Sequence, residues 1–95
     1  MKKYFEQKIG EPVAILCARY WYRGIVSDVN DSYVVLVNPF MVTETGAFTI
    51  NRPRREDALP SDVAISYGAI EVVEQPTWCF AGYDVKSKEE KSKKK

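Results

Sequence analysis

The chain contains no histidine, the side chain that proteins use most often for acid–base chemistry near neutral pH. Its two cysteines, Cys17 and Cys79, stand far apart in the apolar stretches AILCA and TWCFA. In such surroundings we expect buried free thiols more than a disulfide. Two isolated cysteines without histidine do not make a structural zinc site, so we expect no metal and no cofactor.

Long hydrophobic runs are also missing. No stretch approaches the ~20 apolar residues of a membrane span, and the start MKKYFEQKIG lacks the apolar region of a secretory signal peptide. A glycine-rich phosphate loop, a nucleophile elbow and a Cys/His pair are absent as well. We therefore expect a cytoplasmic protein that does not contact a membrane and is not an enzyme. A carboxylate-based site built between subunits is the catalytic alternative left open.

Positive charge is scarce except at one end of the chain. The net charge of the 95 residues is +1, but the last ten, KSKEEKSKKK, hold six lysines and two glutamates. The preceding body has eight basic and eleven acidic residues and is weakly acidic. This composition predicts a disordered lysine-rich tail over 86–95. Such a tail is either a solubility aid or an electrostatic tether for nucleic acid or another polyanion.

The body, 1–85, fits one small domain with a short helix at its start. The helix is predicted over 2–9, because Phe5 and Ile9 share one face and Gly10 follows. At the other end, EQPTWCFAGYDV from about residue 74 is an aromatic extension too apolar to remain in solvent.

The remaining pattern is typical of short, bent strands. Five are predicted, over residues 12–18, 20–30, 33–38, 63–66 and 69–73. Gly24 lies inside the second, and a glycine there usually marks a bend, a bulge or a close backbone approach. Between the third and fourth strands we expect a hairpin turning at 44–46 and an exposed loop over 51–62. The predicted fold is mainly β: a small five-stranded, bent antiparallel barrel of the SH3 or OB type.

The third predicted strand poses a question of its own. Residues Tyr33 to Val37 are consecutively apolar or aromatic, whereas a strand with one wet face alternates. Both faces are therefore expected to be covered. A second copy of the chain is one cover, because so small a domain gains from oligomerisation. The segment Trp78 to Tyr83, folded back on a monomer, is the other.

Two motifs give the chain a family resemblance. In the first, Gly24 lies within a strand, Val26 and Val29 are apolar, Asn30-Asp31-Ser32-Tyr33 make a turn, and Val34 to Val37 form the next strand. The second, VAISYGAIEVV, consists of two short strands around the break Tyr67-Gly68. Over roughly residues 2–73 this order resembles the Sm and Sm-like protein family, which includes the bacterial Hfq proteins.

Four positions differ from the usual family residues. Ala18-Arg19 replaces the common Asn-Gly of the first hairpin, so a wider or differently built turn is expected. Asn30 stands where Asp is usual, Val34 where many members carry a base-contacting Asn, and Tyr67 where the second motif has Arg. None of these differences argues against the fold.

The resemblance implies an Sm-like barrel whose last strand pairs with the fourth strand of a neighbour, giving a homo-oligomeric ring. It further implies that each subunit binds one nucleotide of single-stranded RNA, with DNA as the second choice. The candidate RNA-binding residues come from the turn and the break: Asn30, Asp31, Ser32, Tyr33, Tyr67 and Gly68. The tyrosines would stack on bases and the turn side chains would contact base edges. The competing interpretation makes Tyr33 a core residue and Asn30-Asp31 an ordinary turn.

Arginines supply the candidate phosphate contacts. They are Arg19, Arg23, Arg52, Arg54 and Arg55. Strand alternation places Arg19 and Arg23 on one face with Trp21, where cation–π packing at an interface is an equally good explanation. The other three precede Glu56 and Asp57 in the expected loop. The weakly acidic body counts against nucleic acid. The alternative function is therefore an SH3-like barrel that serves as a protein-interaction or structural assembly module.

Overall fold

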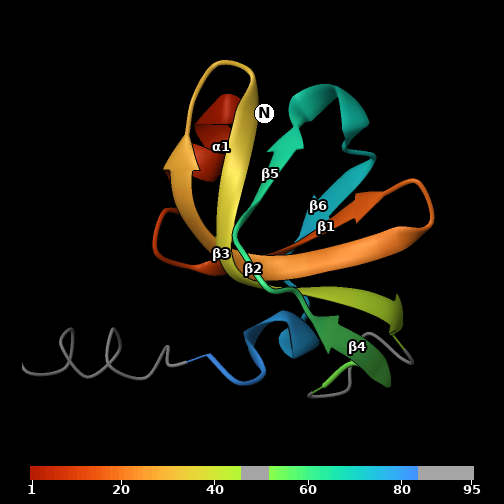
Figure 1. The fold of residues 1–95 in the computed structure, drawn as a ribbon. Helices are drawn as coiled ribbons and strands as arrows, with labels where there is room; N and C mark the ends of the chain where they lie inside the picture. Colours follow the sequence, from red (N-terminus) through yellow and green to blue (C-terminus); the bar gives the residue numbers. More distant parts are fainter. Residues whose placement is uncertain (46–51, 84–95) are drawn as a thin grey trace, which may run out of the picture.

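The structure is a computed structural model that describes residues 1–45 and 52–83. It is mainly β, with one short helix, α1 (Lys2–Glu6), as expected from the sequence (Figure 1). The strands are β1 (Pro12–Cys17), β2 (Tyr20–Val29), β3 (Tyr33–Glu44), β4 (Arg55–Ala58), β5 (Val63–Ser66) and β6 (Val72–Glu74). Two 3₁₀ helices, η1 (Tyr67–Ala69) and η2 (Thr77–Phe80), lie before and after β6. No helix within the described ranges is long and apolar enough to cross a membrane.

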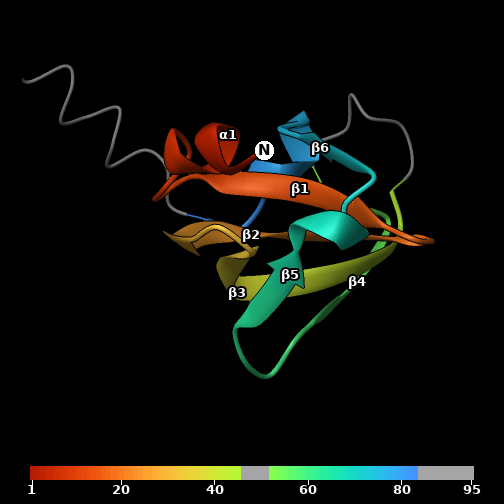
Figure 2. The same cartoon turned by 90° about the horizontal axis from the view of Figure 1, so that it is seen from above.

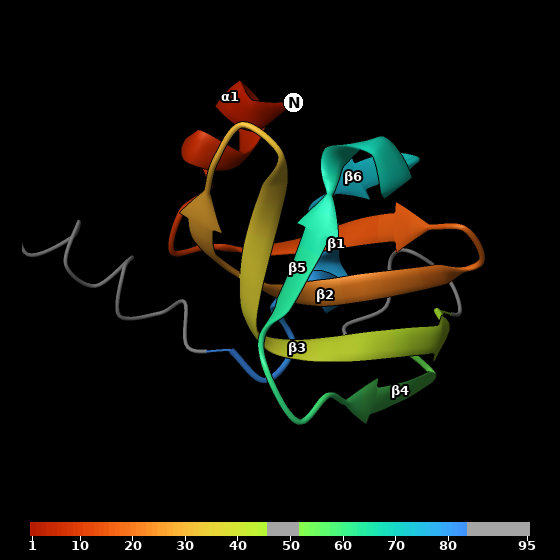
Figure 3. The same ribbon diagram turned by 45° about the horizontal axis from the view of Figure 1, so that its top comes forward.

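All six strands belong to one antiparallel sheet. Its order is β4-β3-β2-β1-β6, and β5 pairs with the first part of β3 (Figure 3). The sheet is not closed, and it has six strands where five were predicted. The mainly β fold with a short N-terminal helix is confirmed, whereas a closed five-stranded barrel does not follow from this pairing.

The element boundaries agree with the sequence for the first two strands and for β5. The helix is shorter than predicted, because α1 ends at Glu6 and turns lead to Gly10, whose φ is +88°. Of the last predicted strand, 69–73, Ala69 ends η1 and only Val72 and Val73 lie in a strand, β6. The first hairpin is tight rather than wide: Cys17 faces Tyr20, and Ala18 takes the left-handed φ of 56° that glycine usually supplies.

Strand β3 continues past the end predicted at Asn38. A bulge absorbs Asn38, with φ 51°, and Pro39, which has no N–H to give to the ladder. Opposite the bulge lies Gly24, where an added Cβ would come within 2.9 Å of the Leu36 Cβ. The prediction that Gly24 marks a bulge or close approach is confirmed. The bend lets β3 pair with β5 through its first half and with β4 through its second.

Strand β4 lies inside the segment predicted to be a loop. Its charged sequence REDA is typical of protected sheet edges, which are hard to distinguish from loops in a sequence. Pairing with the unforeseen second half of β3 is what makes it a strand. The predicted hairpin turn reaches Gly46, which lies outside the described residues.

Strand β1 lies between β6 and β2 in the sheet (Figure 2). Successive side chains of a strand point to opposite faces, so β1 contributes to two apolar clusters. Cluster one contains Val13 and Ile15 and is covered by α1 through Phe5. Cluster two contains Ala14 and is covered by η2 through Trp78 and Cys79, which are fully buried. The aromatic extension is thus folded onto the sheet, as expected. Both cysteines are free, Cys79 buried and Cys17 half-buried.

The apolar run in β3 alternates after all. Val34 and Leu36 are fully buried in cluster one. Val35 and Val37 are half-buried, and Tyr33 is 39% exposed. Within the single chain only one face of this run is fully covered, and Tyr33 is not a core residue. Cover of the other face by a second copy stays a prediction.

Candidate functional site

The two motif segments meet at one end of the molecule. The Tyr67 hydroxyl donates a hydrogen bond to the Asn30 carbonyl at 2.6 Å. The Tyr67 N–H donates to the Ser32 carbonyl at 3.1 Å. These bonds fix η1 against the turn between β2 and β3, as the adjacent ribbons in Figure 3 show. We define the turn site as Lys2, which pairs with Asp31, together with Asn30, Asp31, Ser32, Tyr33, Tyr67 and Gly68.

The Asn30 side chain stabilises the turn, so its side-chain oxygen is engaged within the turn instead of being free for a ligand. Its side-chain oxygen accepts the N–H groups of Ser32 and Tyr33 at 2.8 and 2.9 Å. This local arrangement is an Asx-type turn, which explains why Asn suits the position. The turn leaves the Asp31 and Ser32 side chains exposed at its tip.

Tyr33 and Gly68 complete the exposed rim. Tyr33 begins β3 opposite Ser66 of β5, and 39% of it is exposed. Gly68 is also exposed, and its N–H donates to the Ser66 side chain at 3.3 Å. An added Cβ on Gly68 would meet nothing closer than 3.8 Å, so the backbone there does not require glycine.

Helix α1 adds two residues that the motifs did not indicate. The Phe5 ring stacks on Tyr67 with 6.0 Å between centroids and an interplanar angle of 8°. The Lys2 ammonium lies 2.7 Å from the Asp31 carboxylate. This contact raises the pKa of Lys2 and lowers the pKa of Asp31 through the hydrogen bond and opposite charge. The pairing spans 29 positions, and no local pattern in the sequence signals it.

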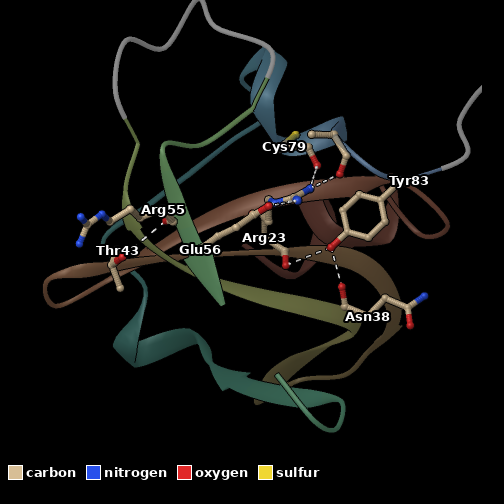
Figure 4. A network of polar contacts seen from close by, with 8 residues as sticks. Arg23, Asn38, Thr43, Arg55, Glu56, Cys79 and Tyr83 are labelled. Atoms are coloured by element: carbon tan, nitrogen blue, oxygen red, sulfur yellow. Dashed lines mark hydrogen bonds and ion pairs between the residues drawn. The ribbon is translucent and has the colours of Figure 1, made fainter. Parts of the chain in front are cut away.

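The Arg23 side chain is fully buried and is therefore not accessible to a phosphate. Its guanidinium makes a bidentate ion pair with Glu56 of β4, at 2.6 and 2.8 Å (Figure 4). It also donates to the carbonyls of Cys79 and Ala81 in the extension. The structure therefore overturns the assignment of Arg23 to phosphate: the side chain ties β2 to β4 and η2.

Aromatic rings enclose the same guanidinium. Its central carbon lies 4.3 Å from the Phe40 centroid and 5.0 Å from that of Tyr83. The Tyr83 hydroxyl donates to the Asn38 carbonyl and fixes the extension to the β3 bulge (Figure 4). The sequence suggested cation–π packing at an interface for Arg19 and Arg23. The structure shows such packing for Arg23 inside the chain, with Phe40 and Tyr83 as partners.

The other candidate arginines do not join the turn site. Arg54 and Arg55 pair with Glu44 at 3.6 and 3.8 Å on the β3–β4 hairpin, which lies at the far end of the sheet (Figure 1). Arg52 is exposed next to the same hairpin, and Arg19 is exposed in the turn between β1 and β2. A phosphate bound at the turn site would therefore not meet these four side chains within the same subunit.

A shallow apolar groove of about 320 Å³ runs beside β5. It is lined by residues of β5 and its neighbours: Cys17, Tyr22, Val63, Ala64, Ile65, Ser66 and Ala69. Burial raises the pKa of the Cys17 thiol. In the part of the chain that the structure describes, no three His, Cys, Asp or Glu side chains gather as a metal site would require.

Comparison with known proteins gives no assignment. No protein-family model matches the chain, and no curated protein matches its sequence. The geometry of the turn site and of the sheet edges is therefore the basis for function.

Proposed function

We propose that the protein is an Sm-like, ring-forming protein that binds single-stranded nucleic acid, RNA before DNA, in RNA or DNA processing or regulation. The carrying observation is that the turn 30–33 and Tyr67 are hydrogen-bonded to each other in one exposed site. The proposal involves no chemical reaction and no cofactor. Cytoplasmic location stays the expectation from the sequence.

The turn site has the parts that single-strand binding uses. Tyr33 is exposed at the rim, so its ring has an area on which a base can stack. Tyr67 is half-buried and stacks on Phe5 beside it. The Ser32 hydroxyl and the Asp31 carboxylate are exposed polar groups beside them. Asp31 accepts hydrogen bonds and Ser32 both donates and accepts, so together they suit base edges.

The sheet edges support a ring. In the described residues β5 pairs with β3 alone and β6 with β1 alone, so each strand leaves one backbone edge for a neighbour. The apolar groove lies beside β5, and Val72 of β6 is 37% exposed. Pairing of β6 with β5 of the next subunit would cover both and, repeated head to tail, would close a ring. In this proposal β3 and β5 curl the sheet into a barrel-like subunit.

Native mass spectrometry tests the ring and its RNA together. Alone, and with short U-rich or A-rich RNA, the chain is expected to form one closed oligomer that takes up one strand per ring. Val72→Lys places a charge in the proposed interface and should shift the oligomer toward monomer. Ile9→Lys is the matched control, because Ile9 is 51% exposed and belongs to neither β5 nor β6, so this variant should leave the oligomer intact. A monomeric wild type that ignores both RNAs would contradict the proposal.

The alternative is an SH3-like module that grips a peptide or builds an assembly. The observation that favours it is the apolar groove beside the free edge of β5, a geometry that accepts an extended strand. A stable monomer without RNA binding would point to this function. A ring that binds no RNA would support the assembly and indicate a structural role instead of RNA binding.

A further inference from the structure

The turn site contains an ion pair that joins two exposed partners. Lys2 of α1 and Asp31 of the turn lie 2.7 Å apart, with 43% and 89% of their side chains exposed. Exposed pairs of this kind are weak, so each partner exchanges readily with ions or other groups in solution. The pair stands beside Asn30, whose carbonyl receives the Tyr67 hydroxyl. An ammonium is thus held at the site by a contact that is easily replaced.

A nucleic acid strand needs such a cation at this place. Phosphate neutralisation supplies much of the affinity for single strands. Arg23 is buried, and Arg54 and Arg55 are engaged with Glu44 at the far end of the sheet. Lys2 is the basic side chain whose contact with the turn site the structure records. A phosphate oxygen that replaces Asp31 would keep the ammonium hydrogen-bonded.

We propose that Lys2 is the phosphate contact of the turn site, and that Asp31 competes with the phosphate for its ammonium. This rests on the proposed function and adds a residue and an internal competitor to it. In the unbound protein Asp31 at 2.7 Å is the nearer of the two carboxylates that neutralise Lys2, and Glu6 of the same helix lies 3.9 Å away. When a single strand stacks on the tyrosines, its phosphate takes the Lys2 ammonium, and the Asp31 carboxylate turns to solvent or to a donor on the base. Asp31 therefore limits affinity instead of adding to it.

The turn allows this competition to be tested without disturbing the fold. Its backbone is held by the Asn30 side chain and by Tyr67, and Asp31 makes none of the turn-closing bonds that the structure records. Asp31→Asn keeps the size of the side chain and removes its charge. Lys2→Gln similarly removes the ammonium at an exposed position. Unchanged thermal melting of each full-length variant would show that the fold is intact.

Binding of fluorescein-labelled U-rich and A-rich RNA, followed by anisotropy at several salt concentrations, is the experiment. We expect Asp31→Asn to tighten binding roughly 2- to 5-fold and Lys2→Gln to weaken it by a similar factor, as for other exposed charge pairs. Lys2→Gln should also lower the slope of log affinity against log salt by about 0.7 for each subunit engaged. Lys3→Gln and Asp62→Asn are the controls, because both residues are exposed outside the turn site.

The double variant separates competition from simple repulsion. If Asp31 acts by holding Lys2, Asp31→Asn should gain less in the Lys2→Gln background than in the wild type. An equal gain in both backgrounds, or a loss of affinity in Asp31→Asn alone, would overturn this inference and leave the proposed function standing. A wild type that binds neither RNA would overturn the proposed function itself.

Discussion

At the scale of the residue, the single side chain of Arg23 makes contacts with several segments of the chain at once. Its guanidinium, fully buried, pairs with Glu56 and donates to two carbonyls of the extension. A planar guanidinium can satisfy all of these acceptors together, which a lysine ammonium cannot do with the same geometry. The side chain therefore links three segments that are distant in the sequence.

Removing either partner of this pair should strongly destabilise the fold. Glu56→Ala leaves a buried guanidinium without its carboxylate, and Arg23→Ala removes the link to the extension as well. We expect each to lower the free energy of unfolding by roughly 3–5 kcal/mol, as for other buried pairs. Urea unfolding followed by tryptophan fluorescence gives the measurement.

Arg55→Ala is the control for that prediction, because Arg55 belongs to the same strand as Glu56 but is exposed. It should change stability by no more than about 0.5 kcal/mol. If Arg23→Ala behaves like Arg55→Ala, the buried pair does not hold the extension.

At the scale of the element, β3 is the strand on which the sheet turns. Its bulge at Asn38 and Pro39 lies opposite Gly24, and the backbones approach closely there. An added Cβ at Gly24 would lie 2.9 Å from the Leu36 Cβ and 3.3 Å from the Val37 carbonyl oxygen. Both neighbours belong to the strand itself and cannot simply swing aside.

Gly24→Ala should therefore destabilise the protein by about 1–3 kcal/mol, the usual range for overpacking. Gly68→Ala is the matched control, because the nearest atom to its added Cβ is 3.8 Å away. That variant should stay within about 0.5 kcal/mol of the wild type. Chemical denaturation of both variants is the measurement, and equal losses would show that the bulge yields without strain.

At the scale of the whole molecule, the extension covers one face of the sheet and makes the stability of the protein fall at alkaline pH. Burial raises the pKa of the Cys79 thiol from 9.0 to about 12, and that of Tyr83 from 10.0 to about 12. Between these values the folded state holds protons that the unfolded chain has released. Stability is thus fully present below about pH 9 and falls as the pH rises toward 12.

Urea unfolding under reducing conditions from pH 8 to 11 tests this dependence. Cys79→Ala should flatten the fall above pH 9, because one of the two buried acids is gone. The same change at half-buried Cys17 should alter the slope less. An unchanged slope in Cys79→Ala would contradict the assignment.

The sequence predicted some of the strands and part of the turn site and missed others. Apolar patterning and stop signals located the first two strands and β5, because these segments bury residues at regular spacing. The turn site was also predictable in part: Asn30 and Tyr67 belong to motifs that the family resemblance places together. Lys2 was missed, since its partner Asp31 is 29 positions away. Strand β4 was missed because a charged edge resembles a loop.

The sequence by itself determined that this is a small, mainly β chain with a short N-terminal helix, since hydrophobic spacing and chain-breaking residues act locally. It also indicated that Gly24 marks a bend, a bulge or a close approach, and that the aromatic extension does not remain in solvent. Only the tertiary structure decided that Arg23 is an internal tie and that Lys2 faces the turn. Those outcomes depend on which distant segments of the chain come into contact. The sequence does not distinguish a charged side chain that is exposed to solvent from one that forms a buried ion pair.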